Sequence, residues 1–258
     1  MKIVVAYKWA SNPQDATVGA EGTVDWSRAK PGFSEYDPVA AELARRLADA
    51  TGAEVIGVTV GTKKVDATLA RKAALSRGFD RAVIVADDSL EGAGSTQLAA
   101  VLAAAVRHIG DVDVVITGDS SVDVGAKMVP TVLAGQLGWP AVAEVISITG
   151  QAGALRVERA IPTGTQVLEI TGPVVLAAST DAAVARVPGM KDILAAGKKP
   201  VESLDLTTLD VPALAATVTV TGTSRPELLA RKGQMIDVTD PAAAAAELVA
   251  ALRGAGAI

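Results

Sequence analysis

A mainly polar, glycine-bearing turn follows a short apolar run near the middle of the sequence. The run is 114–116, and the turn comprises Gly118 and the stretch 119–123. The small residues Gly125 and Ala126 then precede apolar residues at helical spacing. This order predicts a buried parallel strand, a turn and a helix start whose free N–H groups attract an anion. We therefore expect nucleotide phosphate binding at this turn, and an ordinary strand-to-helix crossover is the alternative.

The sequence contains few other candidate catalytic or metal-ligating residues. The chain has no cysteine and one histidine, His108, near the end of an alanine-rich helical stretch. We interpret His108 as a residue of a helix end. The composition excludes disulfides, thiolate metal sites and cysteine nucleophiles, and a single histidine offers no triad or histidine-ligated metal site. This shortage favours a binding or carrier protein over an acid–base enzyme, with no metal.

The composition limits the class of protein further. Of the 258 residues 50% are hydrophobic but only 3% are aromatic, so Ala, Val and Leu must supply the core. The formal charge of −5 makes bulk attraction to nucleic acid or to an anionic membrane unexpected. No signal peptide precedes the first strand-like run, and no apolar run is long enough to cross a bilayer. A cytoplasmic location without membrane insertion is the expectation.

The first half of the chain alternates strand and helix patterns, which predicts a parallel α/β sheet. Between the first strand and the first helix, 8–30 reads as a long loop or irregular hairpin. Asp37 before Pro38 fits the cap of that helix. The expected strands are 2–7, 54–60, 82–86 and 111–117, and the helices are 34–51, 61–78, 97–109 and 125–138.

The second half has a different pattern. Four short strands without helices between them indicate an antiparallel addition to one edge of the sheet: 142–147, 155–160, 166–170 and 174–178. A polar stretch with one short helix at 190–196 follows. We predict one α/β nucleotide-binding domain at 1–200 and a C-terminal arm at 201–258 that lies on a partner subunit. The arm includes a strand at 217–221, a basic segment at 225–235 and a helix at 241–252 capped by Asp240.

Four parts of the chain, in this order and at these separations, resemble the beta subunit family of electron transfer flavoproteins. They are KIVVAYK at 2–8, SEYDPVAAELARRL at 34–47, the turn and helix at 118–140, and RVPGMKDILAAGKK at 186–199. The resemblance covers almost the whole chain. It implies a Rossmann-type domain of the adenine nucleotide alpha hydrolase-like kind.

The resemblance also implies an electron carrier rather than an enzyme, unless the chain is a bifurcating member. In the family an alpha and a beta subunit form a heterodimer. One FAD, held mainly by the alpha subunit, accepts electrons from flavin dehydrogenases such as acyl-CoA dehydrogenase, as in fatty acid oxidation. The beta subunit holds AMP, or a second FAD in bifurcating members.

Carried over residue by residue, the nucleotide pocket combines three strand ends with two helix starts. Asp123 would accept a hydrogen bond from a ribose hydroxyl or orient the loop. The pocket residues are Ala6, Ser34, Glu35, Tyr36, Asp37, Val60, Gly118, Asp119, Ser120, Ser121, Val122, Asp123, Val124, Gly125, Ala126, Lys127, Met128 and Val129. Of these, Lys127, Met128 and Val129 would offer backbone N–H groups to phosphate.

This pocket departs from AMP-binding members of the family. They carry a run of aspartates and then Asn-Gln-Thr, where this chain has Asp123-Val124-Gly125-Ala126 and then Lys127-Met128-Val129. Side-chain hydrogen bonds to a nucleotide should be fewer, so the backbone must contribute more. AMP, a second FAD and the absence of a tightly bound ligand all stay open.

The stretch 186–199 is similar to the loop that docks the dehydrogenase in this family. Met190 stands where the family has a leucine that inserts into the dehydrogenase. The expected docking residues are Arg186, Met190, Ile193, Leu194, Lys198 and Lys199.

Two other functions share the strand–turn–helix phosphate site. One is a stand-alone ATP- or AMP-binding regulator of the universal-stress type, which would need neither the 186–199 loop nor the arm. The other is a hydrolase or synthetase of the same nucleotide superfamily. That function needs a Ser-Gly-Gly loop after the first strand, whereas this chain has Tyr7-Lys8-Trp9-Ala10-Ser11.

Overall fold

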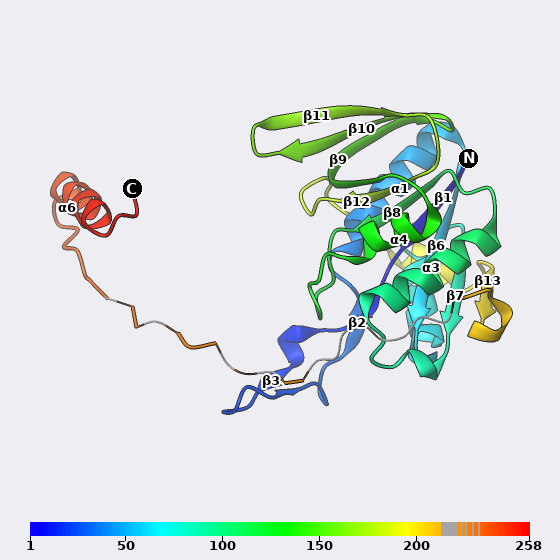
Figure 1. The fold of residues 1–258 in the computed structure, drawn as a ribbon, viewed down its shortest axis with the longest axis horizontal. Coiled ribbons are helices and arrows are strands. Elements are labelled where there is room, and N and C mark those ends of the chain that lie inside the picture. Colours follow the sequence, from blue (N-terminus) through cyan, green and yellow to red (C-terminus); the bar gives the residue numbers. More distant parts are fainter. Residues whose placement is uncertain (213–220, 223, 225, 229, 232) are drawn as a thin grey trace. The chain divides into compact units, whose positions relative to one another are not determined.

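A nine-stranded sheet organises the larger part of the chain (Figure 1). The computed structural model describes residues 1–212, 221, 222, 224, 226–228, 230, 231 and 233–258. The strand order is β11-β10-β9-β12-β8-β1-β6-β7-β13. The strands are β1 (Lys2–Ala6), β6 (Glu54–Gly61), β7 (Arg81–Ala86), β8 (Val114–Gly118), β9 (Ala141–Gln151), β10 (Ala154–Ile161), β11 (Gly164–Ile170), β12 (Val174–Ala178) and β13 (Val201–Leu204).

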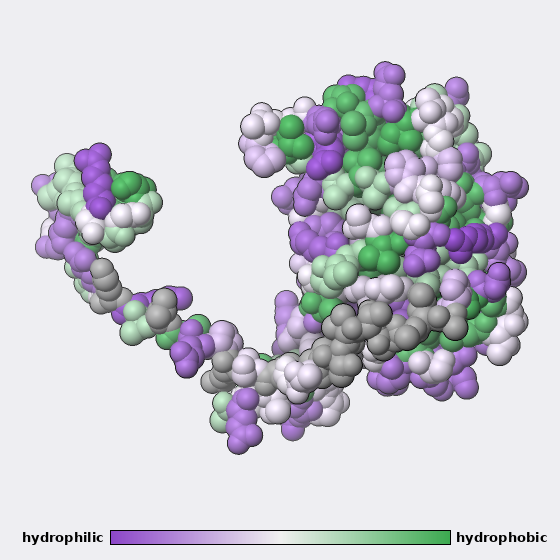
Figure 2. Space-filling view, in the orientation of Figure 1, coloured by the Kyte–Doolittle hydropathy of each residue, from purple (hydrophilic) through white to green (hydrophobic). Residues whose placement is uncertain are grey.

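Pairing is parallel from β9 through β12 and β8 to β13, and β10 and β11 add an antiparallel edge. The α/β fold class and its antiparallel addition are therefore confirmed. Figure 2 shows hydrophobic residues gathered over the end of the sheet where Figure 1 places β9, β10 and β11.

Alternate residues of the central strands point to opposite faces, each covered by helices. In β1, Ile3 and Val5 belong to the buried cluster that includes α1 (Asp37–Thr51) and α2 (Thr68–Leu75). Val4 and Ala6 belong to the cluster that includes α3 (Ser95–Ile109) and α4 (Val129–Leu137). The central strands are thus buried on both faces, as their continuous apolar runs predict.

One predicted strand was assigned to the wrong part of the sheet. The run 174–178 was grouped with the antiparallel addition, but β12 is parallel and lies between β8 and β9. Its five residues are all buried, as is usual for a parallel strand covered on both faces.

The prediction of one continuous helix at 61–78 was also wrong. It forms two pieces, the 3₁₀ turn η2 (Lys63–Asp66) and α2, separated by the extended residue Ala67. The guanidinium of Arg71 donates to the carbonyl and the carboxylate of Asp66 across this break.

The stretch after β1 forms an irregular pair of small hairpins, as expected. The paired strands are β2 (Trp9–Ser11) with β5 (Pro31–Phe33), and β3 (Thr17–Val18) with β4 (Val24–Asp25). Phe33 stacks on Tyr7 with ring centroids 4.9 Å apart, which holds the base of this segment on the core. A short 3₁₀ turn, η1 (Pro13–Asp15), lies between β2 and β3, and the turns η3 (Asp88–Leu90) and η4 (Leu206–Thr208) lie later in the chain.

The chain divides into two compact units, Met1–Gly222 and Thr223–Ile258. Residues 201–204 form β13 on the edge of the sheet, so this part of the predicted arm belongs to the α/β unit. The second unit contains α6 (Pro241–Gly254), and the carboxylate of Asp240 caps it by accepting the N–H groups of Ala242 and Ala243. Most of the predicted strand at 217–221 and parts of 225–235 lie outside the described residues. No helix in the described ranges is long and apolar enough to span a membrane.

Candidate functional site

The carboxyl ends of three parallel strands meet the start of α1 at one edge of the sheet. The register pairs Ala6 of β1 with Val58 of β6 on one side and with Thr117 of β8 on the other. Val60 lies two residues beyond Val58, and Gly118 directly follows Thr117. The edge therefore brings together the strand ends that the sequence placed in the nucleotide pocket. In open α/β sheets ligands bind outside such an edge.

Gly118 lies directly against the start of α1. A Cβ built on Gly118 would stand 2.6 Å from Oδ1 of Asp37 and 2.9 Å from Cβ of Tyr36. Oδ2 of Asp37 accepts the backbone N–H of Lys8 at 2.7 Å, and the same carboxyl accepts the N–H of Gly118. Asp37 thus joins the end of β1 to the end of β8.

This bonding corrects the predicted cap of α1. Tyr36 occupies the cap position, and Asp37 is the first helical residue. Its carboxyl is buried and directed at the backbone of the neighbouring strands. Burial raises the pKa of Asp37 to about 7, although the two N–H donors and the charges of Lys8 and Arg77 act in the opposite direction.

The loop after Gly118 is held by its own ion pairs. Nζ of Lys8 lies 2.7 Å from Oδ2 of Asp123, and Nζ of Lys127 lies 2.7 Å from Oδ2 of Asp119. Burial acts to raise the pKa of Asp123, but the hydrogen bond and charge of Lys8 outweigh it and the pKa is lowered. Of the two roles expected for Asp123, its contacts match the orientation of the loop.

Two residues of the loop have left-handed backbone angles. Gly125 has φ 66° and donates its N–H to the carbonyl of Ser121 at 3.0 Å, while Lys127 has φ 53°. These turns bring the chain back to α4, which begins at Val129 rather than near residue 125 as predicted. Gly125 meets this geometry at little cost, and Lys127 meets it with some strain.

The start of α4 has fewer donors than the sequence suggested. Its cap position is Met128, and Pro130 at the second helical position has no N–H. Among the described residues, no hydrogen bond engages the N–H groups of Lys127, Met128 or Val129. These three groups stay available to an anion, whereas the ammonium of Lys127 is already paired with Asp119.

Two side-chain atoms of the predicted pocket residues are buried without a described hydrogen-bond partner. They are Oγ of Ser34 and Oδ1 of Asp119. Because buried polar atoms are nearly always hydrogen-bonded, each is suited to a hydroxyl or amino group of a ligand, or to water. Both lie in segments that the sequence assigned to the pocket, so the donor and acceptor set fits a nucleoside.

Sequence reasoning missed two contributors to this edge. Lys8 ends the quoted run KIVVAYK, so its position after the first strand was a usable signal. Arg77 lies with its guanidinium carbon 4.7 Å from the ring centroid of Phe33 and interacts with the charge of Asp37. No spacing in the sequence relates Arg77 to Asp37.

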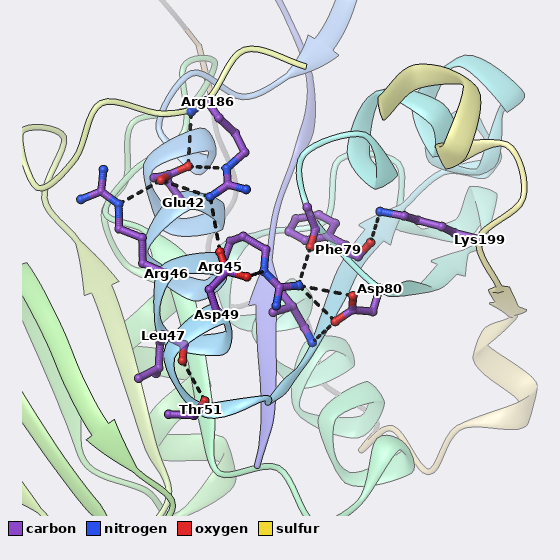
Figure 3. Close-up of polar contacts among 12 residues, drawn as sticks. Glu42, Arg45, Arg46, Leu47, Asp49, Thr51, Phe79, Asp80, Arg186 and Lys199 are labelled. Atoms are coloured by element: carbon purple, nitrogen blue, oxygen red, sulfur yellow. Dashed lines mark hydrogen bonds and ion pairs between the residues drawn. The ribbon is translucent and has the colours of Figure 1, made fainter. Parts of the chain in front are cut away.

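The predicted docking residues fall into two groups. The helix α5 (Met190–Ala196) has the predicted bounds and exposes Met190 by 72% and Leu194 by 69%. Arg186 and Lys199, at the two ends of the stretch, are instead bound within the chain (Figure 3).

Two cavities lie away from the strand ends. One of about 260 Å³ is lined by Leu43, Leu47 and Ile148, among others, and one of about 310 Å³ by Val112 and Leu155. Neither includes a predicted nucleotide residue. Over the described ranges, no group of three or more acidic or histidine side chains is placed to hold a metal ion.

Comparison with known families agrees with this geometry. The model of the electron transfer flavoprotein domain matches residues 22–209. The match spans α1, the loop after β8 and the whole 186–199 stretch.

Proposed function

Because the chain belongs to the electron transfer flavoprotein domain family, whose members are electron carriers, we propose that it is the beta subunit of such a carrier. The domain occurs in both alpha and beta subunits, so the choice rests on a further observation. That observation is the 186–199 stretch, whose pattern is similar to the docking loop of beta subunits. It forms a short helix with Met190 and Leu194 exposed.

The proposed cofactor of the heterodimer is FAD, shared with the alpha subunit. When it is bound, FAD supplies the reversible acceptance of electrons. Most of that site would lie on the alpha subunit. The contribution of this chain is a second nucleotide site at the ends of β1, β6 and β8. There the N–H groups of Lys127, Met128 and Val129 would bind a phosphate, and Asp119 would accept a hydroxyl hydrogen bond.

The number of free donors favours AMP over a second FAD in this site. Lys8 and Lys127 are both paired with carboxylates of the loop. The three free N–H groups could hold one phosphate group, whereas the two phosphates of FAD would need further donors. We therefore propose AMP, with a second FAD as the outcome expected of a bifurcating member.

The proposed partners follow from the same assignment. An alpha subunit would complete the heterodimer, with the unit 223–258 lying on it as an arm. A flavin dehydrogenase such as acyl-CoA dehydrogenase would supply electrons through contact with α5. We propose a role in fatty acid oxidation or a related flavin-dependent oxidation.

The test is flavin reduction by a dehydrogenase. The chain is co-expressed with its alpha subunit, and the purified pair is mixed anaerobically with acyl-CoA dehydrogenase and its substrate. We expect the flavin absorbance of the pair to bleach in proportion to the pair added. A pair that takes up no flavin, or whose flavin no such dehydrogenase reduces, would contradict the proposal.

A further inference from the structure

The first attachment of the 186–199 stretch is an ion pair with α1. Nε of Arg186 donates to Oε2 of Glu42 at 2.7 Å, and Nη2 approaches Oε1 at 3.4 Å. The backbone N–H of Arg186 points to the same Oε2 at 3.4 Å. On the other side, Nε of Arg46 donates to Oε1 of Glu42 at 2.9 Å. Figure 3 shows Glu42 between the two arginines.

The carboxylate of Glu42 is hidden from solvent. Its side chain is 7% exposed, against 44% for Arg186 and 54% for Arg46. The hydrogen bond from Arg186 lowers the pKa of Glu42 to about 2, aided by Arg46 and opposed by burial. Glu42 therefore stays ionised near neutral pH, and it depends on Arg186 as its main partner.

The second attachment is a half-buried cation at the other end of the stretch. Nζ of Lys199 donates to the carbonyls of Leu75 and Phe79 at 2.9 and 2.6 Å. These carbonyls lie at and just beyond the C-terminus of α2, where a cation is favoured. Its neighbour Lys198 is exposed, and no ion pair of Lys198 is present in the described part of the chain.

Between the two attachments, α5 is placed with its apolar side chains outward. Ala196 is buried in the cluster that contains α1 and α2. Met190 and Leu194 are one helical turn apart, so they project from the same face of α5. The carboxylate of Asp192 accepts the N–H of Gly189 at 2.8 Å and holds the first turn.

We propose that Glu42 and the carbonyls at the end of α2 are anchor points for the docking loop. Arg186 and Lys199 are then positioning residues that hold α5 in place, rather than contacts to the dehydrogenase. This inference rests on the proposed function for the meaning of docking. The anchoring itself can be measured without any dehydrogenase.

The first measurement is amide hydrogen exchange of 187–198 in the full chain paired with its alpha subunit. In Glu42→Gln and Lys199→Met we expect exchange about tenfold faster than in the wild type. The matched controls are Arg46→Gln, which leaves the Arg186 contact intact, and Lys198→Met, which removes the neighbouring exposed cation. Unchanged exchange in both test variants, or an equal rise in the controls, overturns the inference.

The second measurement is the kinetics of electron acceptance from acyl-CoA dehydrogenase. Because Glu42 is almost wholly buried, it cannot contact the dehydrogenase itself. Any effect of its substitution on docking must therefore act through the position of Arg186. We expect Glu42→Gln to raise the KM for the carrier about tenfold with kcat nearly unchanged. Arg186→Gln should raise it by a similar factor, and the double variant should be no worse than either single variant.

The outcomes separate the inference from the proposed function. If Glu42→Gln leaves KM unchanged while Arg186→Gln raises it, Arg186 contacts the dehydrogenase directly and the positioning role is wrong. If the wild-type pair is not reduced at all but exchange responds as expected, the anchors are real and the proposed function is wrong.

Discussion

Gly118 and Asp37 are the residues on which the nucleotide edge depends most. Asp37 accepts the N–H groups of Lys8, just after β1, and of Gly118 in β8, and its Oδ1 occupies the space that a side chain at position 118 would need. The glycine is therefore required by close approach and not by its backbone angles. Both residues support the candidate site by joining α1 to the strand ends.

Gly118→Ala should destabilise the fold. The new Cβ would meet Oδ1 of Asp37 at 2.6 Å, which forces α1 or the end of β8 to shift. We expect a loss of about 1–3 kcal/mol in the free energy of unfolding, measured by denaturant titration. Gly172→Ala is the control, because its Cβ would meet nothing within 4 Å. Equal effects of the two substitutions would show that the contact with α1 is unimportant.

Asp37 should make stability fall as the pH rises through the weakly acidic range. Its pKa is 3.8 when unperturbed and about 7 in the fold, so the folded chain binds one more proton between these values. The contribution is complete below about pH 4 and is lost by about pH 7, with a ceiling of about 4 kcal/mol.

Asp37→Asn removes this titration. We expect the stability of the wild type relative to the variant to decline from pH 4 to pH 7, as measured by urea unfolding at each pH. The exposed Asp181→Asn should show no such trend. Parallel pH profiles for wild type and Asp37→Asn would contradict the assignment.

Sequence reasoning proposed the segments of the candidate site but did not predict their contacts within the chain. It expected Arg186 and Lys199 to dock a partner, and in the structure Arg186 pairs with Glu42 while Lys199 donates to the carbonyls of Leu75 and Phe79. The contact between Arg186 and Glu42 joins residues 144 apart, and that between Lys199 and Leu75 joins residues 124 apart. A local sequence pattern cannot predict contacts between residues so far apart. Of these residues only Glu42 stood out in the sequence, as an acidic residue next to the core position Leu43 of α1.

At the scale of elements, strand and helix periodicity predicted most of the architecture. The bounds of α5 and β12 agree with the sequence expectation to the residue. The predicted position of β12 in the sheet was wrong because a five-residue apolar run fits a central parallel strand and an edge strand alike. Only its burial on both faces, which depends on α1 and α4, decides between them.

The helix α6 is capped by one side chain, that of Asp240. It has no buried residue, and Asp240 satisfies two N–H groups of its first turn. Asp240→Ala should cost the helix about 1 kcal/mol. If the arm lies on the alpha subunit as proposed, the affinity of the heterodimer should fall about fivefold in titration calorimetry. The exposed Glu247→Ala is the control, and an unchanged affinity in Asp240→Ala would argue against the arm.

At the scale of the whole molecule, the two compact units have different expected tasks. The unit Met1–Gly222 contains every described strand of the nine-stranded sheet, both core clusters and the candidate nucleotide edge. The unit Thr223–Ile258 contains α6 but none of those features. Folding should therefore depend on the first unit, and association on the second.

A chain ending at Gly222 tests this division. We expect it to fold with an unfolding midpoint within error of the full chain, and to lose co-purification with the alpha subunit. Circular dichroism and affinity pull-down measure the two properties. A truncated chain that is unfolded, or that still binds the alpha subunit fully, would show that the tasks are not divided in this way.

The most direct test of the central claim is a count of the nucleotides released from the purified heterodimer. The pair is denatured, and the released nucleotides are identified and quantified per heterodimer. We predict one FAD, held mainly by the alpha subunit, and one AMP from the edge formed by β1, β6 and β8. Two FAD would contradict AMP as the ligand of this chain and indicate a bifurcating member. Bound ATP without flavin, in a chain that assembles only with itself, would contradict the assignment as a carrier subunit and favour a nucleotide-binding regulator.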